Sequence, residues 1–405
     1  MGDQKARVPV VGAFAAAGNR YCRGSRMTFH TRTVKIHRFP VFDMENRRTL
    51  TTIRYGNPSS GRKAYIQAGL HADEAPGFLV MHHLIDLLDR ADAAKKITGE
   101  IVLVPVANPI GTSQWQGDTL LGRYELYDGV NFNRRHLDIT DRVAKRIENR
   151  LCATAKENIV VIRSAIRKVI KRIQPKSEGE YLKHLLLSLS FDADVVLDLH
   201  CDFQAVLHVY TGTPLWPEAA DLSAQMGAEA TLLCRVSGEH PFDEACSRIW
   251  WELAERYPAY PIPPACLAAT VELRGQTDVN HELGVKDAGN LFTFLKRRGF
   301  IKGSTSAIPS LKNEATPLRG VAYVKAPVPG VVVFLKTPGQ PVKKGETLLE
   351  IVHPLADNRI TPVKSPSSGL LLSTYLDRYA RPGRTLALVA GKKPVKNKGN
   401  ALLAM

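Results

Sequence analysis

The chain has 405 residues and a formal net charge of +16, from 55 Lys and Arg against 39 Asp and Glu. With 44% hydrophobic and 23% charged residues it has the composition of a folded globular protein, which excludes a wholly disordered chain. No run approaches the roughly 18 uncharged apolar residues that a membrane span needs, which disfavours an integral membrane protein. Six cysteines without CxxC spacing are typical of a reducing compartment, so we expect a cytoplasmic protein.

The first three quarters of the chain alternate strand-like and helix-like patterns. Residues 1–30 hold only a short, glycine-interrupted apolar run, and we expect a flexible leader there. Continuous apolar runs, typical of strands that are covered on both faces, occupy residues 63–70, 101–107, 194–199 and 268–273. Residues 76–90 begin with proline and carry apolar side chains at helical spacing. This alternation predicts a three-layer α/β domain over residues 31–315 with a mixed, mainly parallel sheet.

Within that domain, residues 141–185 have helical patterns and are unusually basic. Residues 141–183 contain twelve Lys and Arg against five Asp and Glu, a net charge of +7. We interpret the segment as a solvated helical insertion. It contains no Trp or Phe, and Tyr181 is its only aromatic residue, so the stacking side chains of a nucleic-acid-binding surface are scarce.

Residues 320–391 contain an internal two-fold repeat. Gly330 is followed by Gly345 after 15 residues, Gly369 is followed by Gly383 after 14, and an apolar run lies within each half. Short strands joined by tight turns at this spacing predict a small, separate all-β domain. The last residues, 392–405, are basic, and we expect a disordered tail.

Candidate metal ligands or catalytic residues follow three of the four predicted strands. The run His71-Ala-Asp-Glu74 comes after the first, His200 ends the third, and Glu272 ends the fourth. Ligands of α/β sheets bind at the carboxyl ends of the parallel strands, so these side chains are expected to converge. Imidazoles and carboxylates are ligands of catalytic zinc, and a glutamate nearby can act as a general base. The alternatives are a hydrogen-bonded core histidine at His200 and a capped strand-edge residue at Glu272.

The loop at residues 128–135 adds amides and guanidinium groups after the second strand. Asn133 and Arg134 form a candidate fork for a substrate carboxylate, because arginine binds carboxylates with bidentate geometry. The alternative is a turn with solvated arginines.

These motifs, in their order along the chain, resemble those of the succinylglutamate desuccinylase/aspartoacylase family, which has the M14-type zinc carboxypeptidase fold. The resemblance spans about residues 30–391 and rests on HxxE, N-x-N-R, D-L-H and V-E-L-R-G. It implies a zinc-dependent hydrolase that cleaves the amide bond of a small N-acyl amino acid or N-acyl diamino acid, with one zinc ion per chain. The implied site comprises zinc ligands His71, Glu74 and His200, catalytic residues Glu272 and Arg123, and carboxylate-binding residues Asn133 and Arg134.

The C-terminal repeat is similar to a biotinyl/lipoyl-type barrel-sandwich hybrid. The segment between its halves, residues 353–359, has no lysine for a prosthetic group, so we predict a structural or cleft-shaping module. Two other functions remain open: a zinc carboxypeptidase acting on peptides, and a basic nucleic-acid-binding protein. The leading interpretation has no nucleic-acid or membrane partner and leaves homo-oligomers open.

Overall fold

The computed structural model describes residues 30–42, 44, 47–355, 359–394 and 402. The expected leader therefore lies outside the described residues except for His30, as does most of the expected basic tail. Within the described residues, no helix combines the length and apolar character needed to cross a membrane.

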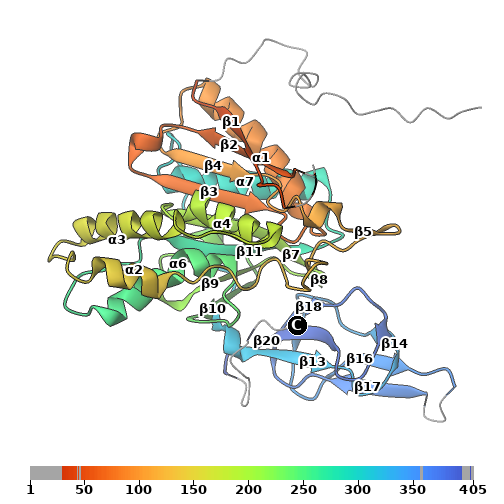
Figure 1. Ribbon diagram of the computed structural model, residues 1–405. Coiled ribbons are helices and arrows are strands. Elements are labelled where there is room, and N and C mark those ends of the chain that lie inside the picture. Colours follow the sequence, from red (N-terminus) through yellow and green to blue (C-terminus); the bar gives the residue numbers. More distant parts are fainter. Residues whose placement is uncertain (1–29, 43, 45–46, 356–358, 395–401, 403–405) are drawn as a thin grey trace, which may run out of the picture.

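A nine-stranded sheet forms the centre of the larger unit (Figure 1). Its strands are β1 (Thr33–Arg38), β2 (Thr49–Tyr55), β3 (Lys63–Ala68), β4 (Glu100–Val104), β7 (Val195–Asp202), β9 (His208–Gly212), β10 (Ala230–Cys234), β11 (Leu267–Gly275) and β12 (Thr316–Pro317). Their order is β1-β2-β4-β3-β7-β11-β9-β10-β12. The runs β4-β3-β7-β11 and β9-β10-β12 are parallel, whereas β1, β2 and the β11-β9 pair are antiparallel. This confirms the predicted mixed, mainly parallel sheet.

Helices cover both faces of this sheet, which explains the continuous apolar strands. Alternate residues of β3 enter different cores: Tyr65 faces one, while Ala64 and Ile66 face the other. Because both faces are buried, strand positions of both parities are apolar. One core is shared with α1 (Pro76–Ala93), α5 (Ala220–Met226) and α7 (His281–Arg297), and the other with α2 (Thr140–Ile147), α3 (Ala155–Ile170), α4 (Glu178–Ser190) and α6 (Phe242–Arg256).

The basic segment folds as α2, α3 and α4 and buries one apolar face. Val143, Ile162 and Ile166 lie in the same core as Trp250 of α6. Most of its Lys and Arg residues are exposed on the opposite side. The segment is therefore integral to the core of the α/β unit, and only its charged face is solvated as expected.

The C-terminal repeat forms two antiparallel sheets around one shared core. Its strands are β13 (Val321–Lys325), β14 (Gly330–Phe334), β15 (Pro341–Val342), β16 (Thr347–Val352), β17 (Ile360–Lys364), β18 (Gly369–Thr374), β19 (Tyr379–Ala380) and β20 (Thr385–Ala390). The first four strands match the last four in order and closely in length, so the sequence repeat is also a structural repeat. Gly345 and Gly383 occupy equivalent turns with φ of +85° and +82°, a conformation that favours glycine. The barrel-sandwich-hybrid topology stays a prediction.

The two units meet beside the end of β7. The short strand β8 (Gln204–Ala205) follows β7 directly and pairs with β18 of the C-terminal unit. The rings of Phe203 and Tyr375 pack across the same junction, with centroids 4.4 Å apart. A small hairpin, β5 (Trp115–Gln116) and β6 (Thr119–Leu120), projects near this end of the sheet (Figure 1). The C-terminal unit therefore contacts the segment that directly follows the strand carrying His200.

Asp92 near the end of α1 fastens the segment that leads into β1. Its carboxylate, 1% exposed, accepts hydrogen bonds from the backbone N–H groups of His30, Thr31 and Arg32 at 2.7 to 3.1 Å. Burial opposes ionisation, but the Thr31 hydroxyl and these N–H groups hold the pKa of Asp92 below its ordinary value. The ionised carboxylate therefore stabilises the fold above the pKa of an unfolded aspartate, and this contribution is lost as pH falls through the lower folded pKa.

We expect Asp92→Ala to lower the free energy of unfolding by about 2–4 kcal/mol, because three backbone donors lose their acceptor. Urea unfolding at neutral pH measures this loss, and the difference from the unsubstituted chain should shrink in acid. The exposed Asp118 offers a matched control, since Asp118→Ala removes a carboxylate from a surface loop. Equal stability of the two variants would contradict this role for Asp92.

Candidate active site

The three candidate metal ligands converge at the carboxyl ends of β3 and β7. His71 and Glu74 lie in the loop between β3 and α1, and His200 lies near the end of β7. Their ligand atoms lie within 4.8 Å of one another, and all three side chains are buried. His71 Nδ1 is 2.8 Å from Glu74 Oε1, and His200 Nδ1 is 2.9 Å from Glu74 Oε2. The Nδ1 atoms of both imidazoles therefore face one carboxylate.

The remaining ring nitrogens face oxygen acceptors. His71 Nε2 lies 2.7 Å from Asn131 Oδ1, and His200 Nε2 lies 2.9 Å from Asp198 Oδ2. Gln67 Nε2 donates to the other oxygen of Asp198 at 2.9 Å. Imidazoles that bind metals are usually fixed in this way, with the second nitrogen donating to an oxygen. Two such imidazoles and a carboxylate fit a zinc ion, whose catalytic sites use three protein ligands.

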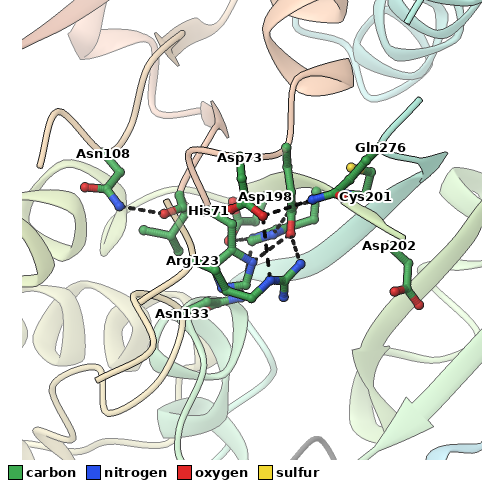
Figure 2. Close-up of polar contacts among 12 residues, drawn as sticks. His71, Asp73, Asn108, Arg123, Asn133, Asp198, Cys201, Asp202 and Gln276 are labelled. Carbon is green, nitrogen blue, oxygen red and sulfur yellow. Dashed lines mark hydrogen bonds and ion pairs between the residues drawn. The ribbon is translucent and has the colours of Figure 1, made fainter. Parts of the chain in front are cut away.

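Neighbouring loops hold the HxxE loop in place. Asn108, at the end of β4, donates from Nδ2 to the Leu70 carbonyl oxygen at 2.8 Å (Figure 2). The Ala72 N–H donates to the Gly122 carbonyl oxygen at 3.0 Å. A Cβ at Gly122 would lie 2.7 Å from the Ala72 side chain, so this approach requires glycine. The loop that carries two candidate ligands is thus fixed by segments 38 to 50 residues further along the chain.

Glu272 lies beside His200 on the adjacent parallel strand, where the two residues are register partners. Its Oε2 atom is buried and has no hydrogen-bond partner among the described residues. Burial raises the pKa of Glu272 to about 8; His200 and Arg123 oppose this rise, and Glu74 adds to it. A buried carboxyl group with an unused oxygen and a pKa near neutrality is suited to exchange protons.

Arg123 contacts the candidate ligand set directly. Its Nη2 atom lies 2.6 Å from Glu74 Oε1, and its Nε atom lies 3.9 Å from Asp73 Oδ2. Gln276 donates to the same Asp73 oxygen at 2.9 Å, which ties the loop after β11 to the HxxE loop (Figure 2). Although burial opposes it, the charges of Glu74 and Asp73 raise the pKa of Arg123. Its positive charge is therefore held beside Glu74.

The candidate ligands line a cavity, and Asn133 and Arg134 lie along it too. Both residues also make contacts with other parts of the protein. Asn133 Oδ1 accepts a hydrogen bond from the Phe242 N–H at the start of α6, at 2.9 Å. Arg134 Nη1 donates to the Asn133 carbonyl oxygen at 2.7 Å, and its Nε atom lies 3.8 Å from Glu239 Oε2. Burial lowers the pKa of Arg134, which nevertheless remains a cation at neutral pH. The guanidinium group thus sits largely buried at the cavity wall.

The cavity has a volume of about 70 Å³, which is room for several water-sized groups. The seven residues named from the sequence all lie along it. The C-terminal unit also contributes to its wall, through Val321 and Tyr323 of β13 and Leu388 of β20. Sequence reasoning did not find Tyr323, or Tyr210 of β9, because neither belongs to a motif at a strand end. Asp198 and Asn131, which contact the candidate ligands, lie within D-L-H and N-x-N-R, beside the residues that these motifs single out.

Comparison with known proteins places these features in a family. The Succinylglutamate desuccinylase/Aspartoacylase catalytic domain family matches residues 60–296. No curated protein sequence matches the chain. Among solved structures, a protein assigned as a succinylglutamate desuccinylase/aspartoacylase from Shewanella frigidimarina NCIMB 400 is similar, with a TM-score of 0.78 and 24% identity over 91% of this chain and 100% of that one.

Two further structures extend this similarity. A succinylglutamate desuccinylase/aspartoacylase family protein from Shewanella amazonensis SB2B has a TM-score of 0.77 and 25% identity, over 88% of this chain and 98% of that one. The ectoine utilization protein EutE (DoeB) from Ruegeria pomeroyi, solved with product bound, has a TM-score of 0.63 and 16% identity, over 90% of this chain and 97% of that one. The likenesses to the Shewanella frigidimarina and Ruegeria pomeroyi structures, at 24% and 16% identity, concern the fold alone. The family match covers more than half of the chain, so this chain belongs to the succinylglutamate desuccinylase/aspartoacylase family.

Proposed function

We propose that the protein is a zinc-dependent hydrolase that cleaves the amide bond of a small N-acyl amino acid or N-acyl diamino acid. One observation carries the proposal: a single cavity presents the His71-Glu74-His200 set, the Glu272 carboxyl group and the Arg134 guanidinium group. Family membership supports the hydrolase class. Zinc bound by the three ligands would supply a Lewis acid that polarises the acyl carbonyl and lowers the pKa of water.

The chain's own residues account for the proton transfers. Glu272 would accept a proton from the attacking water, whose oxygen forms the new bond to the acyl carbon. As the C–N bond breaks, Glu272 would return that proton to the departing amine, so the products are a carboxylic acid and an amine. Its high pKa suits the second step, because the carboxyl group holds a proton readily near neutral pH. Arg123, paired with Glu74, would add positive charge near the developing oxyanion.

The lining of the cavity supports small substrates over peptides. Tyr323 and Leu388 of the C-terminal unit form part of its wall and narrow access to the candidate ligands. A peptidase requires an open groove for the chain that precedes its scissile bond. The C-terminal unit would therefore act as a cleft-shaping module.

We expect Arg134→Ala to raise KM for a carboxylate-bearing substrate by about 10- to 150-fold, because a hydrogen bond to a charged group contributes roughly 1.5–3 kcal/mol. Because this contact would be made in both the ground and transition states, kcat should change little. Arg135→Ala is a matched control, since Arg135 adjoins Arg134 but is exposed. Steady-state kinetics measure both constants, and an unchanged KM in Arg134→Ala would argue against carboxylate recognition by this residue.

A substrate screen tests the proposed activity itself. The full-length chain is stripped of metal, resupplied with zinc, and assayed with N-acetyl and N-succinyl amino acids, N-acetyl diamino acids and short peptides. The proposal predicts release of free amine from N-acyl amino acids or diamino acids, and no turnover after chelation. Preferential cleavage of peptides would favour the carboxypeptidase function, and turnover that survives metal removal would refute zinc dependence.

A further inference from the structure

Three histidines and an aspartate gather on the outer surface where α1 crosses α7. His82, His83 and Asp86 lie on α1, and their ligand atoms lie within 4.8 Å of one another. His281, the first residue of α7, brings its Nδ1 atom to 3.0 Å from His83 Nε2. None of these four residues lines the cavity described above. The group is therefore separate from the candidate active site.

The packing of the two helices holds the imidazoles together. Gly284, one turn along α7 from His281, faces the ring of His83, and a Cβ at this position would lie 2.9 Å from His83 Cδ2 and 3.0 Å from Leu79 Cγ. Glycine thus permits the close approach that brings the two rings together. The rings of His83 and His281 meet edge to face with centroids 5.2 Å apart, and those of His82 and His83 lie 5.0 Å apart.

The chemistry of the cluster determines which cation it suits. A metal ion binds imidazole in its neutral form, through a ring nitrogen. Nitrogen ligands with one carboxylate suit a late first-row divalent cation such as Zn²⁺ rather than Mg²⁺ or Ca²⁺.

From this arrangement we infer a second metal site, formed by His82, His83, Asp86 and His281, that binds Zn²⁺ on the molecular surface. A metal ion there would join α1 to α7. Helix α1 begins directly after the HxxE loop, and α7 follows the strand that carries Glu272. His83 lies about 10 Å along α1 from its first residue, from a rise of 1.5 Å per residue. The second ion would therefore stabilise the pair of helices behind the active site without entering the cavity.

Metal counting tests this inference independently of any activity. The full-length, tag-free chain is stripped with chelator, dialysed against Zn²⁺ and analysed by atomic emission and titration calorimetry. The unsubstituted chain should bind about two zinc ions, and His83→Ala/His281→Ala should bind about one. His71→Ala/His200→Ala should also retain about one, since it keeps the surface site. A double control, His30→Ala/His353→Ala, removes the same number of imidazoles away from the cluster and should still bind about two.

Thermal unfolding gives a second readout. In the His71→Ala/His200→Ala background, adding Zn²⁺ should raise the Tm, because the metal binds the folded state, and His83→Ala/His281→Ala should abolish that shift. An equal zinc count with and without His83→Ala/His281→Ala would overturn the inference, as would a Tm shift that survives these substitutions. Failure of the proposed hydrolase function would appear instead as absent turnover with zinc stoichiometry unchanged.

Discussion

Replacing Glu272 with Gln is expected to lower kcat by about 10³–10⁴-fold while leaving zinc bound at the active site. Glutamine keeps the size of the side chain but cannot accept and return a proton. The Oε2 atom of Glu272 is buried and has no hydrogen-bond partner among the described residues, and His200 is the register partner of Glu272 on the next strand. Stopped assays of amine release, together with metal analysis of the same sample, measure the two effects.

Glu282→Gln provides the matched control for this experiment, because Glu282 is exposed at the start of α7. It should leave kcat unchanged. The unsubstituted enzyme should also lose activity on the acid side of its pH profile as Glu272 becomes protonated and can no longer act as a base. A Glu272→Gln variant with a near-normal rate would exclude Glu272 as the base and would direct attention to other carboxylates of the cavity.

Replacing Glu74 with Ala is expected to remove the active-site metal and abolish turnover. Glu74 faces the Nδ1 atoms of both candidate histidine ligands, pairs with Arg123 and accepts the Cys201 N–H at 2.9 Å. Although burial opposes it, His71, His200 and Arg123 lower the pKa of Glu74 well below its ordinary value, so the carboxylate is ionised at neutral pH. Without metal, the free energy of unfolding of Glu74→Ala should be about 3–5 kcal/mol lower than that of the unsubstituted chain, because Arg123 would lose its closest buried partner.

Asp73→Asn is a matched control, since Asp73 adjoins Glu74 and lies near Arg123 but does not belong to the His71-Glu74-His200 set. It should retain the metal. Both variants are compared in the His83→Ala/His281→Ala background, so that the metal count reports the active site alone. Full zinc occupancy in Glu74→Ala would contradict the ligand assignment, and unchanged stability in chelator would contradict the role of the ion pair.

The sequence predicted the elements that carry the site because their patterns are local. Strands β3, β4, β7 and β11 are apolar at successive positions, since helices cover both faces of the sheet, and each appears where an apolar run ends in a polar residue. Parallel strands bring their carboxyl ends to one edge, so the approach of His71 and Glu272 to His200 follows from topology. The strands β9 and β10 and the helices α5 and α6 carry no such motif, so they were not predicted as separate elements.

Contacts between distant segments were beyond the reach of the sequence. The pairing of Arg123 with Glu74, and the presence of Tyr323 in the cavity wall, depend on how separate loops and units pack. The basic segment is a second example. Its composition indicated a solvated insertion, whereas packing buries one face of α2, α3 and α4.

The sequence by itself determined the mixed sheet, the C-terminal repeat and the residue types at the strand ends, because hydrophobic period and turn residues act over a few positions. Of the net charge of +16, +7 falls in residues 141–183, where most Lys and Arg side chains are exposed, so composition alone said little about chemistry. Tertiary structure alone decided which nitrogen of each histidine faces Glu74, that Glu272 Oε2 has no hydrogen-bond partner among the described residues, and how His83 meets His281. These features depend on the approach of side chains from different elements to within hydrogen-bonding distance. No local sequence pattern encodes that approach.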